Sequence, residues 1–249
     1  MFSKKGTYLP TEMFSLTHVV ASVICLAVVL IGVYLVRDLK KENNKKFHII
    51  ISSVFSGLIL MEIIYEIYVK NISLQSLLPL SVNFLVLVSM LLLFCKNKTI
   101  CLFSKTIIAY VGVGYGVFSL IFLIPSITNY PIFHIECLIQ MFTASIMLFA
   151  GLTILVKKEV EINIKSLKIA LCILFDFVVD CLIINLVFDT NYLFLISPQG
   201  INLPFLNSLY LFSSELYSVA IFMFYFVLIL SVFVVYKCFE FMVDKYNKD

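Results

Sequence analysis

The chain has 249 residues, of which 62% are hydrophobic and 13% are charged, and its formal net charge is +3. Ordinary soluble domains carry about 25% charged residues, so this composition excludes a soluble globular enzyme, a disordered chain and a nucleic-acid-binding module. The hydrophobic residues fall in long uninterrupted runs, which are typical of membrane-spanning helices. The sequence therefore predicts an all-α, polytopic membrane protein, in which residues 1–249 form one domain and no nucleic acid is a partner.

Seven stretches of the chain are long enough to cross a membrane, which takes about 20 mainly apolar residues. In chain order they cover about residues 14–36, 47–69, 76–95, 102–125, 131–156, 165–188 and 209–236. The fourth and fifth stretches are separated only by the short segment between Pro125 and Pro131, which predicts a tight turn. We expect seven transmembrane helices in a single bundle.

The Lys and Arg residues predict the orientation of this bundle. Of the 18 Lys and Arg residues, all but Lys4, Lys5 and Lys70 follow the first, third, fifth or seventh expected helix. Loops that carry positive charge stay in the cytoplasm, so we expect the N-terminus outside and the C-terminus in the cytoplasm. The localisation that follows is a multi-pass protein of the cell membrane, and the Lys-, Asn-, Ile- and Phe-rich stretches suggest a bacterial plasma membrane.

Cofactor and metal motifs are absent from the sequence. The seven cysteines are scattered and form no CxxC pair, which argues against a disulfide framework or a zinc site. The last expected helix has no Lys before its inner end, which excludes a retinal cofactor. A Val-Gly-Tyr-Gly string lies inside a continuous apolar stretch, so Gly112 and Gly116 predict a close-packing helix face rather than an ion filter. We expect no cofactor and no bound metal.

Ionisable residues inside a membrane are costly and therefore raise a functional hypothesis. In this chain the polar side chains gather in the outer halves of several expected helices, whereas the inner halves are mainly apolar. The polar residues are His18, Glu62, Glu66, Ser81, Asn83, His134, Glu136, Gln140, Thr143, Asp176, Asp180, Asn185 and Glu215. We expect them to line a polar cavity that opens toward the outer face or the outer leaflet.

Helical spacing predicts which of these residues share a face. Glu62 and Glu66 are four residues apart, and Cys172, Asp176 and Asp180 repeat at the same interval, so each set lies on one side of its helix. We expect these faces to turn toward the bundle interior, although interhelical hydrogen bonding is an alternative role for each residue. An acidic cavity would favour amine-bearing substrates, lipid headgroups or protons. The substrate-binding residues predicted on these grounds are Glu62, Asn83, Asp180, His18 and His134.

Three sequence features resemble the YwaF-type family of bacterial membrane proteins, which is related to eukaryotic transmembrane protein 164. Glu62 lies late in the second expected helix and is followed by Leu78-Pro79-Leu80, and a Gly-rich fourth helix ends at Pro125. The third feature is Asn185 followed by Asn191-Tyr192-Leu193-Phe194-Leu195 and Pro198. The resemblance implies a seven-helix fold and a link, in the eukaryotic branch, to acyl transfer on phospholipids. It also adds Asn191 and Tyr192 to the residues expected to bind substrate or to fix the outer loop.

The sequence departs from the family pattern at the residues that the resemblance links to acyl transfer. In family members the Leu-Pro-Leu motif continues as His-x-Cys, and the Cys is the expected acyl carrier, but this chain has Ser81-Val82-Asn83. The second family histidine would fall near residues 144–145, about ten positions after His134. An Asn side chain is no nucleophile, so Ser81 becomes the candidate catalytic residue, with Cys137 as a further candidate.

Four hypotheses follow from these observations. The first is a protein that binds a lipid or amphiphile in an outward-facing polar cavity and has lost acyl transfer. The second is an active phospholipid acyltransferase with a rearranged site. The third is a small, proton-coupled transporter that uses Glu62, Glu66, Asp176 and Asp180, and the fourth is an accessory subunit that docks a membrane-protein partner. Membrane lipids are the expected partners in all four.

Overall fold

The computed structural model describes residues 14–39, 41–70, 80–122, 130–198 and 204–246. Every regular element within these ranges is a helix, which confirms the all-α class. Six helical stretches are long and apolar enough to cross a membrane. Four of them are the single helices α1 (Leu16–Val36), α2 (Lys41–Lys70), α7 (Ile135–Val156) and α8 (Ile164–Phe188).

The other two long stretches differ from the expected helices. The fourth expected helix is a rod made of α5 (Lys98–Ile107), the π-helical η1 (Ile108–Gly112) and α6 (Val113–Phe122). The last expected helix, 209–236, is split into the short α9 (Pro204–Phe212) and the long α10 (Ser214–Tyr246). The hydroxyl of Ser213 accepts from the Leu216 N–H at 3.2 Å, so it caps the start of α10.

The third expected helix is shorter in the structure than the sequence predicts. It is represented by α4 (Val82–Leu92), which has 11 residues and is therefore about 16 Å long, whereas the hydrocarbon core of a membrane is about 30 Å thick. Part of the expected stretch, residues 76–79, lies outside the described residues, as does most of the predicted turn between Pro125 and Pro131. Seven transmembrane helices therefore stay a prediction.

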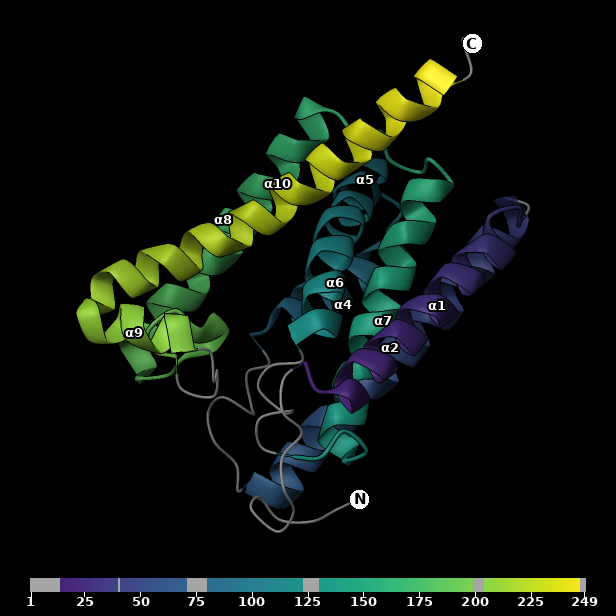
Figure 1. The fold of residues 1–249 in the computed structure, drawn as a ribbon. Coiled ribbons are helices and arrows are strands. Elements are labelled where there is room, and N and C mark those ends of the chain that lie inside the picture. Colours follow the sequence, from purple (N-terminus) through teal and green to yellow (C-terminus); the bar gives the residue numbers. More distant parts are fainter. Residues whose placement is uncertain (1–13, 40, 71–79, 123–129, 199–203, 247–249) are drawn as a thin grey trace.

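The helices alternate in direction along the chain. Figure 1 shows α1, α4, α7 and α10 running toward one end of the bundle and α2, the α5–α6 rod and α8 running back. Most Lys and Arg residues lie at the end where α2, α5 and α8 begin, which we call the basic end. We call the other end the opposite end. Which of the two faces the cytoplasm stays a prediction.

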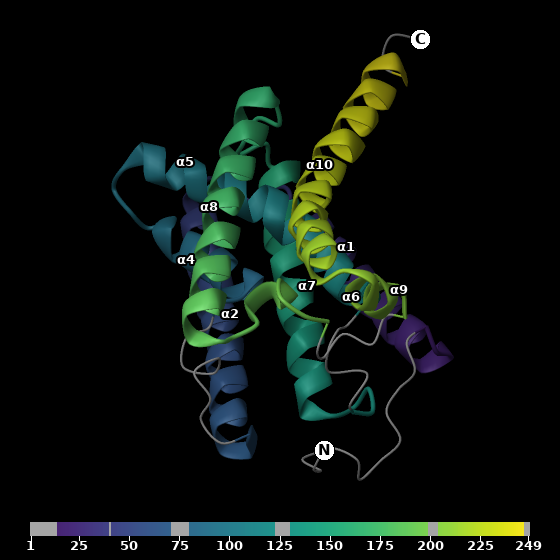
Figure 2. The same ribbon diagram turned by 90° about the vertical axis from the view of Figure 1, so that its left-hand side faces the viewer.

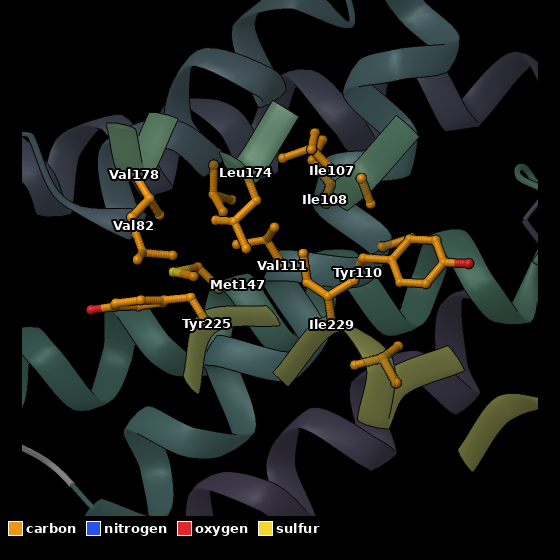
Figure 3. Packing of buried hydrophobic residues seen from close by; sticks show 14 of the residues in the cluster. Val82, Ile107, Ile108, Tyr110, Val111, Met147, Leu174, Val178, Tyr225 and Ile229 are labelled. Carbon is orange, nitrogen blue, oxygen red and sulfur yellow. The ribbon is translucent and has the colours of Figure 1, made fainter. Parts of the chain in front are cut away.

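Helix α7 is the central element of the bundle. It contacts α1, α2, α4 and the α5–α6 rod, whereas α8 packs against α5 and α10. Helix α10 also packs against α6, and Figure 2 shows the two near each other. The largest core lies between these helices. Apolar side chains from α4, η1, α7, α8 and α10 interdigitate there, among them Val82, Val111, Met147, Leu174 and Ile229 (Figure 3).

Glycines allow α7 and the α5–α6 rod to pack backbone against backbone. A Cβ atom on Gly112 would lie 2.9 Å from the Met147 carbonyl oxygen, and one on Gly116 would lie 2.9 Å from the Leu148 nitrogen. From the other helix, a Cβ on Gly151 would lie 2.8 Å from the Ile108 oxygen. Any larger residue would force the two backbones apart. The predicted close-packing face with Gly112 and Gly116 is therefore confirmed.

A network of polar side chains lies at the basic end. Lys158 has a φ of +52°, and the Glu159 N–H donates to the Ile154 carbonyl at 3.0 Å, which is a Schellman turn at the end of α7. This turn directs the Glu159 carboxylate toward α2 and α5. There it lies 2.8 Å from the Lys105 Nζ and 3.4 Å from the His48 Nε2. One carboxylate thus joins three segments of the chain.

Candidate functional site

The predicted site residues do not all meet in one place. Asp180 lies on the exposed side of α8, and Ser81, Asn191 and Tyr192 belong to turns and helix caps. Glu62 and Asn83 are half-buried on α2 and α4. The two histidines are buried at the opposite end. The polar cavity expected from the sequence is therefore divided among several separate environments in the described part of the chain.

The acidic stripe of α8 faces away from the bundle. Cys172, Asp176 and Asp180 are exposed, so the prediction that this face turns inward is wrong. The buried residues of α8 include Leu174, Val178, Cys181 and Asn185, which pack into the main core or bond the next loop. An apolar stripe with the same helical period takes the inward position, because α8 packs against α5 and α10 through apolar side chains.

Ser81 serves as the N-cap of α4. Its hydroxyl accepts from the Phe84 N–H at 3.3 Å, which satisfies one of the free amide groups at the start of the helix. No histidine or carboxylate among the described residues hydrogen-bonds to this hydroxyl. A serine nucleophile needs such a base within reach. The structure accordingly gives Ser81 a capping role, and its catalytic role stays a prediction.

Asn191 and Tyr192 shape a compact loop that follows α8, which we call the strap (residues 190–198). The Asn191 Oδ1 accepts from the Ile196 and Ser197 N–H groups at 3.0 and 3.2 Å. Asn185 of α8 also holds the strap. Its Oδ1 accepts from the Tyr192 N–H at 2.6 Å, and its Nδ2 donates to the Tyr192 carbonyl at 2.9 Å. These bonds use the amide groups of both asparagines to fix the loop.

Two tyrosines of α10 hold the strap from the other side. The Tyr217 hydroxyl donates to the Phe194 carbonyl at 2.9 Å, and the Tyr225 hydroxyl donates to the Leu193 carbonyl at 3.1 Å. Leu193 and Phe194 both have positive φ angles, +57° and +56°, which is uncommon for bulky residues. The tyrosine bonds hold this backbone in place. The sequence motif around residues 191–195 thus marks a structural loop, and the bonds from α10 were not predicted.

His134 lies at the contact between α2 and α7. Its ring stacks on Tyr130 with centroids 4.0 Å apart and planes 4° from parallel. The Nδ1 atom accepts from the Glu136 N–H at 3.3 Å, and the Tyr65 hydroxyl lies 3.5 Å from Nε2. Both ring nitrogens therefore have neighbours within the protein. The same turn holds the buried Cys137 thiol 3.9 Å from the Tyr130 carbonyl.

His18 lies in a different setting, in the first turn of α1. The imidazole is 1% exposed, and its Nδ1 accepts from the Phe14 N–H at 3.1 Å. Its Nε2 makes no hydrogen bond with any of the described residues. Ser15 caps this helix by accepting from the His18 N–H at 3.4 Å. His18 is therefore a buried polar side chain whose Nδ1 is bonded within its own turn and whose ring lies beside the Leu120 carbonyl.

An apolar groove runs beside His18, between α1, α6 and α7. Its volume is about 230 Å³, and His18 and Ser22 are the polar residues among its lining side chains. The lining residues are Phe14, His18, Val19, Ser22, Val23, Leu26, Val117, Leu120, Ile121 and Leu148. Several of them, including Val19, Val23 and Ile121, are exposed along the side of the bundle, so the groove opens laterally. We call it the α1 groove.

The described residues offer no obvious metal site, since no group of three or more His, Cys, Asp or Glu side chains gathers among them. The α1 groove is the concave site that combines an apolar wall with a buried polar group, which is the usual character of a ligand pocket. Of the predicted substrate-binding residues, only His18 lines it.

The sequence matches the TMEM164 family over residues 13–236, which is nearly the whole chain. No curated protein and no solved structure matches it. The family match supports the resemblance to transmembrane protein 164 that was inferred from the sequence features.

Proposed function

We propose that this chain, which belongs to the TMEM164 family, is a multi-pass membrane protein that binds the hydrocarbon chain of a lipid or other amphiphile in the α1 groove. The observation that carries the proposal is the groove itself. It is lined mainly by apolar side chains, opens on the side of the bundle and has His18 in its wall. We also propose the finer features, namely seven spans, an external N-terminus and a bacterial, YwaF-type relative in the plasma membrane.

The size of the groove suits one hydrocarbon chain. Pockets for drug-sized ligands have volumes of about 300–1,000 Å³, and the α1 groove is smaller, at about 230 Å³. Its lateral opening between α1 and α6 would allow a chain to enter from the surrounding bilayer, without passing through water. A single acyl or alkyl chain therefore fits better than a bulky, two-chain or polar ligand.

We propose binding without acyl transfer at the position that the family pattern suggests. Asn83 stands where the pattern has its cysteine, and an amide cannot attack an ester. The neighbouring Ser81 hydroxyl is used in the cap of α4. The buried Cys137 thiol lies against a backbone carbonyl of its own turn rather than in the α1 groove. The candidate nucleophiles thus lie apart from the site that would hold the chain.

Photolabelling tests this proposal directly. A fatty amphiphile with a diazirine near its terminal methyl would be added to liposomes that contain the purified protein, irradiated, and located by peptide mass spectrometry. We expect labelled peptides from α1 and α6. Val117 lines the groove and is exposed on α6, so Val117→Trp should fill the groove and reduce the labelling of these peptides to background.

The matched control is Val227→Trp, because Val227 is exposed on α10 and does not line the groove. This variant should be labelled like the wild type. Labelling spread evenly over all lipid-facing helices, or unchanged in Val117→Trp, would contradict chain binding in the groove.

A further inference from the structure

We propose that the acidic stripe of α8, made of Cys172, Asp176 and Asp180, is a docking surface for a transmembrane helix of another membrane protein, and that this helix carries a Lys or Arg near its centre. All three side chains of the stripe are exposed. The stripe belongs to a different helix from those that form the α1 groove. The proposal therefore goes beyond the binding of a hydrocarbon chain and can fail independently of it.

The two carboxylates lie deep in the membrane-spanning part of α8, which is long and apolar enough to cross a bilayer. Asp176 is the middle residue of this helix, so about 18 Å of helix lies on either side of it. Asp180 follows one turn later, about 6 Å away along the axis. The hydrocarbon core of a bilayer extends about 15 Å from its midplane. Both side chains are therefore at the depth of the lipid acyl chains.

The surface around these carboxylates is apolar. Phe175 and Ile183 lie beside the stripe on the same helix and are themselves exposed, whereas other sides of α8 pack against α5 and α10. Charged residues within a membrane almost always face the interior of a bundle or a water-filled cavity, where they are paired. An exposed stripe between apolar side chains becomes such an interior face when another helix covers it.

Within the described residues, the stripe has no cation beside it. Neither Asp176 nor Asp180 takes part in an ion pair there. The nearest cations along α8 are Lys165 and Lys168, which lie in its first two turns at the basic end, and Lys168 is about 12 Å from Asp176 along the axis. A carboxylate in hydrocarbon needs a positive charge at its own depth. The occupant must therefore bring a Lys or Arg to the centre of its span.

Two other occupants match the stripe less well. A second copy of the chain, inserted in the same direction and related by a twofold axis, would place Asp176 against Asp176 at the same depth, where like charges repel. An amphiphile with an ammonium headgroup would hold that group at the membrane surface, about 15 Å from the midplane. A transmembrane helix can hold its cation at the level of Asp176.

Disulfide cross-linking at Cys172 tests the proposal with synthetic peptides. The probe is a poly-leucine transmembrane peptide with one central Lys and one Cys a helical turn away, so that a Lys opposite Asp176 brings the Cys opposite Cys172. Two peptides, with the Cys before or after the Lys, cover both orientations. Peptide and purified protein would be mixed in phosphatidylcholine liposomes and oxidised with copper phenanthroline, and the disulfide at Cys172 would be quantified by mass spectrometry.

Polar contacts between helices in membranes change association by about three- to tenfold. We therefore expect the Lys peptide to be linked to Cys172 by this factor more than a peptide with a central Leu. A peptide with a central Glu should be linked no more than the Leu peptide, because it brings a third carboxylate to the stripe.

Substitutions on α8 assign the preference to the stripe. The double variant Asp176→Asn, Asp180→Asn should link the Lys peptide no more than the Leu peptide, and each single variant should lose part of the preference. Both side chains are exposed, so the variants should fold, which circular dichroism in detergent checks. Asp189→Asn is the matched control, because Asp189 is exposed at the end of the same helix, and it should be linked like the wild type.

Equal linking of the Lys and Leu peptides in the wild type would overturn the proposal, as would a preference for Lys that persists in the double variant. Equal linking of the Glu and Lys peptides would overturn it too, since polarity rather than charge would then be recognised. Disulfides between Cys172 residues of two copies, formed in dilute liposomes without peptide, would assign the stripe to a second copy instead. The α1 groove is tested separately, by the photolabelling of Val117→Trp.

Discussion

The two ends of the bundle differ in how many hydrogen-bond and ion-pair partners surround a buried polar side chain. At the basic end, the Glu159 carboxylate has Lys105, His48 and Asn44 as partners. At the opposite end, the His18 imidazole is even more buried, yet its Nε2 has no partner among the described residues. Buried polar groups are normally satisfied by the fold. The contrast indicates that the basic end holds the helices together, and it fits the proposal that the groove beside His18 takes a ligand.

The electrostatics of Glu159 show how strongly the basic end is paired. Burial by itself would raise the pKa of Glu159, but hydrogen bonds from His48 and Lys105 and their positive charges outweigh it and lower the pKa to about 2. The charged carboxylate is therefore favoured in the folded protein relative to an ordinary glutamate with a pKa of 4.5. Its side chain is only 11% exposed, so solvent screens these interactions weakly.

The largest loss of stability is expected from Glu159→Gln. Each pKa unit corresponds to about 1.4 kcal/mol, so the lowered pKa predicts a loss of roughly 3 kcal/mol in the free energy of unfolding at neutral pH. Because the folded pKa is depressed, the advantage of the wild type is complete above about pH 4.5 and is lost as the pH falls toward 2. Unfolding in detergent, followed by circular dichroism at several pH values, measures both quantities.

Glu161→Gln is the matched control, because Glu161 lies two residues away and is exposed. Its substitution should change the free energy of unfolding by less than about 0.5 kcal/mol. If both variants changed the free energy of unfolding equally and only slightly, the network at the basic end would add little stability. The two ends would then not differ in the way described above.

A smaller loss of stability is expected from Ser81→Ala, which tests whether Ser81, near the opposite end, has a structural role. Loss of an N-cap costs about 1 kcal/mol, and Ser81→Asp should recover that stability because a carboxylate also caps a helix. Thermal unfolding of the three proteins measures the difference. Wild-type stability in Ser81→Ala would contradict the capping role, and a base would then have to be sought beside the hydroxyl.

The sequence predicted the helical segments well but not which side of α8 faces inward. Hydropathy marks a span because the bilayer demands apolar residues, and the glycines at 112 and 116 mark close packing because no side chain fits there. On α8, however, the stripe of Asp176 and Asp180 and the stripe of Leu174 and Val178 have the same period. Periodicity predicts which residues share a face of a helix but not which neighbouring helix covers that face. In a bilayer, moreover, an apolar face is equally stable against lipid and against protein, so apolarity alone does not identify the buried side.

The candidate site could be predicted only in part. His18 was singled out from its depth in the first helix, and it lines the α1 groove, but its binding role stays a prediction. The setting of its ring depends on the Phe14 N–H, which reaches Nδ1 through a positive φ angle that no sequence pattern indicates. The groove is formed by residues of α1, α6 and α7 that are about 100 positions apart in the chain, so its lining follows from tertiary packing alone.

A small effect on the free energy of unfolding is also expected from His18→Leu, although His18 is more buried than Glu159. Removing a paired buried group costs the fold its interactions, as at Glu159, whereas removing an unpaired donor relieves a desolvation penalty. The lost bond from the Phe14 N–H opposes this gain. The free energy of unfolding should change by less than about 1 kcal/mol in lipid-free detergent. A loss as large as that of Glu159→Gln would mean that the fold itself needs His18.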